Sequence, residues 1–192
     1  MKKWKMLLLC ALIVVTLTAC GNLSDISGDT IVIDKKGVVT GVIVEEFKES
    51  YYDGEELKNM VMQEVSNYNS EAGSENVTLS SFEVKDGIVS VFLEYKNAND
   101  YKTFNDKEFF AGTISQAYDA GYNFVEMKSA DGTKTLLPEE VLEKGDSHII
   151  IWEEPVAIRT SGTIAYTSSN VEIKANKEAA ATAEDGLFYI IY

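Results

Sequence analysis

The chain has 192 residues, of which 31 are acidic and 17 basic, and a formal charge of −14 at neutral pH. This charge excludes nucleic acid as a natural partner, because phosphate binding requires a basic surface. With 45% hydrophobic residues, the chain is long enough to bury a sizeable core.

The first twenty residues carry the pattern of an export signal. Met1–Lys5 contains three lysines, and Met6–Ala19 is apolar apart from two threonines. A basic start, a short apolar stretch and a small residue before the cleavage point are typical of a secretory signal. Such a signal is cleaved off and is not part of the folded domain. The alternative, a transmembrane helix, needs roughly 20 apolar residues, whereas this run stops at Gly21-Asn22.

The signal ends in Leu17-Thr18-Ala19-Cys20, which resembles the lipobox of bacterial lipoproteins. The resemblance implies that a diacylglyceryl group is attached to the Cys20 sulfur and that the lipoprotein signal peptidase cuts between Ala19 and Cys20. Two acyl chains hold a protein stably on a bilayer, where one chain anchors it only marginally. We therefore expect lipidation at Cys20 and a mature protein anchored at the extracytoplasmic face of the cell membrane.

Cysteine usage and charge agree with this interpretation. The two cysteines are Cys10, inside the signal, and Cys20, at the lipid site. The mature protein is thus expected to have no disulfide and no cysteine nucleophile or metal ligand. Removing the signal takes three lysines and no acid, so the mature charge is −17. Such a charge argues against a domain lying flat on anionic lipid, because basic segments are the ones that do so.

Three segments follow from this pattern: a signal peptide over 1–19, the lipidated Cys20 with a short tether over 20–29, and a single extracytoplasmic domain over 30–192. The nine residues between Cys20 and Thr30 reach at most about 30 Å when extended. We expect the domain to work close to the bilayer.

The N-terminal half of the domain reads as two hairpins, each followed by a helix. The expected strands are Thr30–Asp34, Val38–Phe47, Val77–Val84 and Ile88–Tyr95. Lys35-Lys36-Gly37 turns the first hairpin and Asp86-Gly87 the second. Alternation slips at Ser80-Ser81, which indicates a bulge.

Both helices are expected from their capping signals. Asp53, with Glu56 three residues later, predicts a helix that continues to about Tyr68. Asn105, with Glu108 three residues later, predicts a second helix that continues to Gly121.

The C-terminal third is predicted to be rich in strands. Pro138 is expected to begin a short helix that ends at Gly145, and Asn176–Asp185 an alanine-rich loop or short helix. The expected strands are His148–Trp152, Val156–Thr160, Thr163–Thr167, Val171–Lys174 and Leu187–Tyr192. The last strand is apolar on both faces, which is typical of a strand covered on both sides. The expected fold class is α+β: mainly antiparallel sheet, two principal helices packed on it, and a β-rich C-terminal third.

Three short stretches near the C-terminus resemble the ending of uncharacterised lipoproteins of Gram-positive anaerobes. They are Gly162-Thr-Ile-Ala-Tyr, Asn170-Val171-Glu172 and Gly186-Leu-Phe-Tyr-Ile-Ile-Tyr. The resemblance implies no activity and no site residue.

Gly145-Asp146-Ser147-His148 superficially resembles the Gly-Asp-Ser block of one esterase and lipase family. That family holds its serine near the start of an α/β domain and its histidine far downstream, whereas His148 is the single histidine of this chain and follows Ser147 directly. Adjacent strand residues point to opposite faces, so these two are not placed to act as nucleophile and base. We expect a turn before a strand, and we assign no catalytic residue.

Four pairs of adjacent glutamates are candidates for acid–base catalysis. Acid–base catalysis needs two carboxyl groups about 5 to 10 Å apart across a substrate, and adjacent glutamates diverge instead. The adjacent pairs are Glu45-Glu46, Glu55-Glu56, Glu139-Glu140 and Glu153-Glu154.

No metal or cofactor residue is assigned. Zinc would need His or Cys ligands that the mature chain lacks. Asn97-Ala-Asn99-Asp-Tyr101-Lys102 begins like a calcium loop and departs from that pattern at Tyr101 and Lys102. Trp152, Tyr51 and Tyr52 could stack on a sugar ring, although single aromatic residues usually belong to the core.

The favoured hypothesis is a surface-tethered, non-enzymatic binding or accessory module with a membrane-protein or envelope-polymer partner. The alternative is an extracytoplasmic enzyme of unrecognised type that uses distant carboxylates, for which a deep pocket with converging carboxylates would speak. A solute-binding lipoprotein is disfavoured, because those proteins usually have two lobes and a far longer chain.

We predict that Cys20→Ser leaves an exported precursor that is uncleaved at Ala19 and carries no lipid, because the cysteine sulfur is the attachment atom. Mass spectrometry of the native protein and of the variant measures both changes. An unmodified N-terminus at another residue of the native protein would contradict the lipobox interpretation.

Overall fold

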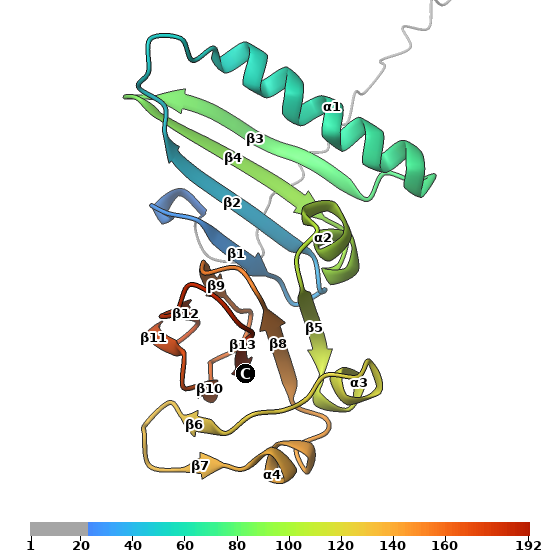
Figure 1. Ribbon diagram of the computed structural model, residues 1–192, viewed down its shortest axis with the longest axis vertical. Coiled ribbons are helices and arrows are strands. Elements are labelled where there is room, and N and C mark those ends of the chain that lie inside the picture. Colours follow the sequence, from blue (N-terminus) through green and yellow to red (C-terminus); the bar gives the residue numbers. More distant parts are fainter. Residues whose placement is uncertain (1–22) are drawn as a thin grey trace, which may run out of the picture.

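A computed structural model describes residues 23–192, which fold into two sheets with helices on their outer faces (Figure 1). The first elements are η1 (Leu23–Asp25), β1 (Thr30–Ile33), β2 (Val39–Glu46), α1 (Gly54–Ala72), β3 (Val77–Lys85), β4 (Ile88–Tyr95), α2 (Ala98–Asn105), β5 (Phe109–Thr113) and α3 (Ile114–Asp119). The remaining ones are β6 (Met127–Ser129), β7 (Thr135–Leu136), α4 (Pro138–Leu142), β8 (His148–Trp152), β9 (Ala157–Arg159), β10 (Tyr166–Ser168), β11 (Val171–Ala175), β12 (Glu178–Ala181) and β13 (Phe188–Ile191). The expected signal, its cleavage point at Ala19 and the lipid site at Cys20 lie outside the described residues.

The strands confirm the α+β class. One sheet has the order β11-β12-β9-β1-β2-β4-β3, and the other has the order β5-β8-β13-β10-β6-β7. Strand pairs within the described chain are antiparallel, apart from β1 with β9. Because β1 lies between β2 and β9, the N-terminal hairpin shares a sheet with β9, β11 and β12 of the C-terminal third, while β8, β10 and β13 belong to the other sheet.

The core has two layers, one on each face of the six-stranded sheet. On one face, Ile150, Trp152, Phe188 and Ile190 pack against the seven-stranded sheet. On the other face, a second cluster joins the sheet to α3 and α4; it consists of Ile114, Ala117, Met127, Val141, Ile149, Ile151, Tyr189 and Ile191. The prediction that the last strand is covered on both sides is confirmed, since all four residues of β13 are buried.

The helix α1 follows the sequence prediction closely. The Asp53 carboxylate accepts hydrogen bonds from the backbone N–H groups of Glu55 and Glu56, at 2.9 and 3.1 Å, and so caps the helix. The helix ends at Gly73, whose φ of 67° is left-handed. The β3–β4 turn at Asp86-Gly87 also matches, with φ of 52° and 75°, as a two-residue hairpin of this type requires. The bulge expected at Ser80 is present between Leu79 and Ser81.

The helix predicted from Asn105 to Gly121 is wrong over its first half. Asn105 ends α2, which begins after the cap Asn97, and Asp106 closes it in a left-handed conformation. Phe109 and Phe110 then belong to β5, which pairs with β8. Since Phe109 enters one core layer and Phe110 lines the other, the two aromatic rings fit a strand with two covered faces and not one helix face.

The alanine-rich stretch 176–185 contains a strand, β12, where a loop or short helix was expected. It pairs with β9 on one side and β11 on the other. Ala179 is completely buried opposite Ile158, so small side chains let this strand fit into a crowded part of the sheet.

The segment before β1 is fixed to the domain. The Asp25 carboxylate accepts a hydrogen bond from Arg159 Nη1 at 2.9 Å, and Asp29 Oδ1 accepts one from the backbone N–H of Val44 at 2.9 Å. The Arg159 hydrogen bond lowers the pKa of Asp25, so this contact is kept at neutral pH and opens only in acid, as the pH falls through the lowered pKa. The tether expected over 20–29 is therefore attached to the domain from Asp25 onward. None of the helices within residues 23–192 is long and apolar enough to cross a membrane.

Asp100 of α2 is connected by hydrogen bonds to the C-terminal part of α1 and to the loop before β3. Its Oδ1 atom accepts hydrogen bonds from the Tyr68 hydroxyl of α1, at 3.0 Å, and from Asn76 Nδ2 before β3, at 2.9 Å. Asp100 itself belongs to α2 and is buried. Although α1 contains no fully buried residue, Leu57, Val61 and Val65 pack partly buried against the core, and this polar contact adds to their attachment of the helix.

We predict that removing residues 187–192 abolishes cooperative unfolding, because each large side chain of β13 contributes roughly 1.5–3 kcal/mol by burial. Thermal melting followed by circular dichroism measures the loss. Glu184→Ala, in the exposed loop before β13, is the matched control and should melt like the native chain. A truncated chain that melts like the full one would contradict the central place of β13.

We predict that Asp100→Ala lowers the free energy of unfolding by about 1–3 kcal/mol, because it leaves the Tyr68 hydroxyl and the Asn76 amide without their acceptor. Asn99→Ala, at an exposed neighbouring position, is the control and should change stability by less than about 0.5 kcal/mol. Urea unfolding compares the two variants. Equal stabilities would show that Asp100 does not hold α1 in place.

Candidate functional site

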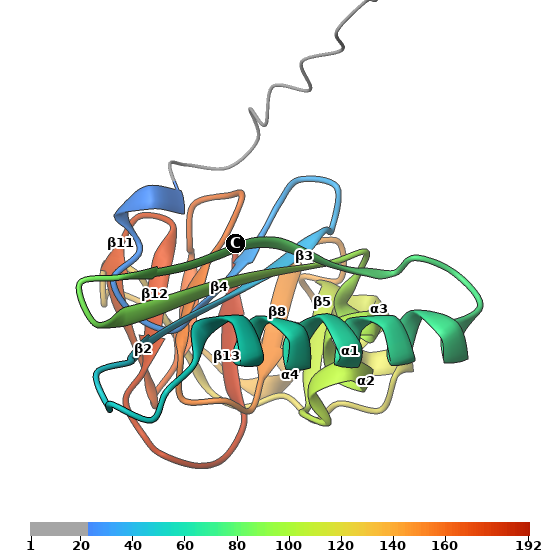
Figure 2. The same cartoon turned by 90° about the horizontal axis from the view of Figure 1, so that it is seen from above.

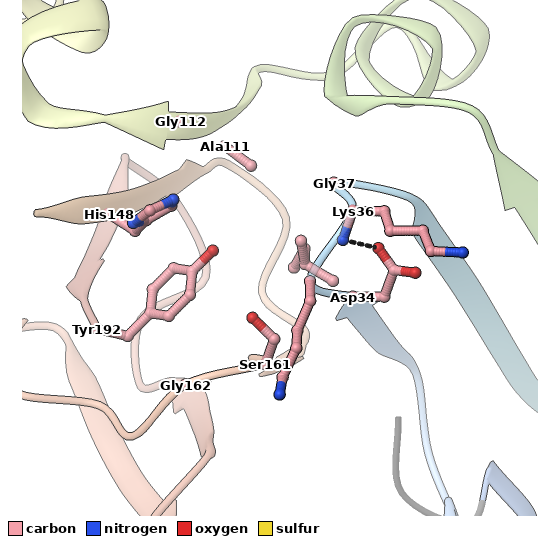
Figure 3. A pocket seen from close by; sticks show the side chains of 11 residues that line it. Asp34, Lys36, Gly37, Ala111, Gly112, His148, Ser161, Gly162 and Tyr192 are labelled. Carbon is pink, nitrogen blue, oxygen red and sulfur yellow. Dashed lines mark hydrogen bonds between the residues drawn. The ribbon is translucent and has the colours of Figure 1, made fainter. Parts of the chain in front are cut away.

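A polar cleft lies between the two sheets, where the β1–β2 turn approaches β5, the start of β8 and the C-terminal residue (Figure 3). Its volume is about 520 Å³. The lining residues are Ile33, Asp34, Lys35, Lys36, Gly37, Ala111, Gly112, His148, Ser161, Gly162 and Tyr192.

One wall is a rigid turn that presents two lysines. Asp34 Oδ1 accepts hydrogen bonds from the backbone N–H groups of Lys36, at 2.7 Å, and Val38, at 2.9 Å. The chain reverses at Gly37, whose φ of 82° is left-handed and suits glycine. The Asp34 carboxylate is thus used within its own turn, while the Lys35 and Lys36 side chains are exposed.

The opposite wall is formed by Tyr192 and His148, with Ser161 between the two walls (Figure 3). The backbone N–H of Tyr192 donates to the His148 carbonyl at 3.0 Å, and the two ring centroids are 5.6 Å apart. Gly162 is required here, because a Cβ atom at this position would lie 2.9 Å from Tyr192 Cδ2. Burial raises the pKa of the Tyr192 phenol, so its hydroxyl is protonated at neutral pH and can donate a hydrogen bond to a ligand.

The charges of the cleft are unusual for such an acidic protein. Lys35 and Lys36 have no carboxylate partner within the described chain. Lys177 lies at the rim, where its Nζ donates to the Ser161 carbonyl at 2.8 Å. Asp34 is the one side-chain carboxylate in the lining, and Tyr192 adds the carboxylate of the chain end. The cleft therefore offers ammonium groups, a phenol and an imidazole to a ligand, and it holds no converging carboxylate pair.

The fold places the residues of the Gly145-Asp146-Ser147-His148 sequence in different environments. His148 lines the cleft, whereas Ser147 does not. The backbone N–H of Ser147 donates to the Lys144 carbonyl at 2.7 Å, and the Ser147 carbonyl accepts from the Ile114 N–H at 3.0 Å. The string is a turn leading into β8, as its sequence predicted.

The residues of the candidate calcium loop and the candidate sugar-stacking aromatics have structural roles or lie outside the cleft. Asn97 caps α2 by accepting from the N–H groups of Asn99 and Asp100, at 2.9 and 3.1 Å. Trp152 is completely buried, so it cannot stack on a sugar. Tyr51 and Tyr52 are exposed, and they contact each other edge to face with centroids 5.0 Å apart. No group of three or more His, Cys, Asp or Glu within residues 23–192 is arranged to hold a metal ion.

The fold does bring two distant acids together at the end of α2. The backbone N–H of Glu108 donates to Glu153 Oε2 at 3.0 Å. Glu108 Oε1 accepts from the Tyr122 hydroxyl at 3.0 Å and also pairs with Lys102. The hydrogen bond from Lys102 lowers the pKa of Glu108, so this carboxylate is ionised and engaged by the protein's own donors.

Sequence reasoning missed Tyr192 and the turn lysines as cleft residues. Lys35 and Lys36 were visible only as hairpin turn residues, and Tyr192 only as the end of an apolar strand. The signal that unites them is the pairing of β13 with β8, which no local pattern encodes. No model of a protein family, no curated protein sequence and no solved structure matches this chain.

Proposed function

We propose that this chain is a membrane-anchored extracytoplasmic lipoprotein whose domain is a non-enzymatic binding or accessory module, with the cleft as its binding site. The lipobox at Leu17 to Cys20 supports the anchor. The docking of Asp25 on Arg159 supports a module held near the membrane, because it shortens the free tether.

The chemical groups that line the cleft are the main support for a binding function. Concave sites with a few convergent polar groups are the usual places of ligand binding. Here a rigid turn carries Lys35 and Lys36 across the cleft from Tyr192 and His148, with the Lys36 ammonium directed away from these two rings (Figure 3). These groups can donate hydrogen bonds to an anionic or hydroxyl-rich partner, such as an envelope polymer or a polar segment of a membrane protein.

The enzyme alternative rests on the contact between Glu108 and Glu153. General acid–base catalysis needs carboxyl groups that face a substrate. Glu108 instead accepts hydrogen bonds from Tyr122 and Lys102, and Glu153 accepts one from the Glu108 backbone. These bonds favour a structural role for the two acids, so the binding module is the better supported function.

We predict that defined envelope fragments perturb the NMR signals of cleft residues Gly37, Ser161 and Tyr192 when added to residues 21–192. Peptidoglycan fragments and a glycerol-phosphate polymer are the two probes. Lys36→Glu should weaken the perturbation, because it reverses one charge of the turn and leaves Lys35 in place. Lys134→Glu, at an exposed turn outside the cleft, is the matched control and should leave it unchanged.

Ester and glycoside substrate panels test the enzyme alternative on the same protein. Turnover that disappeared in both Glu108→Gln and Glu153→Gln, with melting unchanged, would overturn the binding module. So would ligand perturbations that map away from the cleft and ignore Lys36→Glu.

A further inference from the structure

The anchor segment joins the domain on a defined side. Arg159 Nη1 donates to Asp25, and Arg159 Nε donates to Glu178 of β12 at 2.6 Å. Arg159 is the single arginine in the chain. Only the residues between Cys20 and Leu23 separate the expected lipid site from η1, and three peptide units reach about 10 Å when extended. A lipid on Cys20 would therefore bring this side of the domain to the bilayer.

Several residues that line the cleft belong to this same side. Arg159 precedes the cleft residue Ser161 by two positions, and Val32, which pairs with Arg159 in β9, precedes the cleft residue Ile33. Figure 2 shows η1, in dark blue, and the β1–β2 turn, in lighter blue, along one edge of the molecule. The β12–β13 loop, in red, lies at the opposite edge.

We call this side the tether face and define it by η1, the β1–β2 turn (34–37), Ser161-Gly162 and Lys177. Lys177 belongs to it because its Nζ donates to the Ser161 carbonyl. Three ammonium groups of this face, on Lys35, Lys36 and Lys177, lack carboxylate partners within the described chain. With Asp25 and Asp34 counted against the three lysines, this face carries a formal charge of +1, whereas the mature chain as a whole carries −17.

Resting on the proposed lipid anchor, we propose that the tether face is the surface through which this domain contacts the bilayer, where Lys35, Lys36 and Lys177 bind the phosphate groups of lipid headgroups. Ammonium groups near a membrane are attracted to its anionic headgroups. The acidic remainder of the surface is repelled by the same headgroups. The cleft then opens toward the membrane, and a ligand reaches it at the headgroup layer.

The orientation can be measured with single labels on the lipidated protein. Cys20 is the one cysteine of the mature chain and is occupied by lipid, so an introduced cysteine is a unique labelling site. Asn176→Cys, exposed in the turn next to Lys177, reports on the tether face. Glu184→Cys, exposed in the β12–β13 loop, reports on the opposite edge. Each carries a fluorophore in phosphatidylglycerol vesicles that contain a headgroup-attached quencher.

We predict that quenching at position 176 is severalfold stronger than at position 184. Asp25→Asn should bring the ratio toward one, because it removes the bond that fixes the anchor segment and leaves Arg159 paired with Glu178. Asp185→Asn, which removes an exposed acid at the opposite edge, is the control and should keep the ratio. Lys35→Gln combined with Lys36→Gln should also lower it, through loss of the headgroup contacts.

Mass spectrometry of the labelled protein separates the two ways of failing. A protein without lipid on Cys20 overturns the proposed anchor and this orientation together. A lipidated protein with equal quenching at the two positions, or stronger quenching at 184, overturns the orientation alone. A ratio unchanged by the double lysine variant overturns the headgroup contacts.

Discussion

The pairing of β8 with β13 is the contact on which the rest of this structure depends. Their registers run from Phe188 opposite Trp152 to Ile191 opposite Ile149, and all eight of these strand residues are buried. A strand pair that is apolar on both faces needs cover on both, so the seven-stranded sheet covers one face and α3 and α4 cover the other. The same pairing continues to His148 and Tyr192. The strands that form the centre of the core therefore also form one wall of the cleft.

Arg159 connects the seven-stranded sheet to the first described residues of the chain. It lies in β9, between β12 and β1, and its guanidinium donates to a carboxylate on each side, Glu178 and Asp25. A planar guanidinium presents several donors in fixed directions, which a lysine ammonium does not. The side chains of Arg159 and Glu178 are only 24% and 28% exposed, so their bond is less screened by solvent than that of a surface pair, whereas Asp25 is 65% exposed. One side chain thus links β9 to β12 and to the segment that precedes β1.

Local signals predicted the elements whose structure is decided locally. Asp53 and Asp86-Gly87 act through their own backbone neighbours, so the sequence placed α1 and the β3–β4 turn correctly. Asn105 and the alanines of β12 were misread, because helix signals there compete with strand pairing to distant partners, which alone decides the outcome. The cleft could not be predicted from the sequence for the same reason. Its walls come from the β1–β2 turn, β5, β8 and the C-terminus, and none of them carries a motif of its own.

The net charge of the domain and the charge of its cleft act over different distances. At physiological ionic strength the Debye length is about 8 Å, so exposed charges farther apart than this are largely screened from one another. A phosphate group at the β1–β2 turn would therefore interact mainly with Lys35, Lys36 and Lys177, and only weakly with acids on α1 or at the opposite edge. Asp34 is the carboxylate within this turn, and two backbone N–H groups already bind its Oδ1 atom. The large negative charge thus disfavours anionic surfaces over most of the domain, while the three lysines make one face compatible with them.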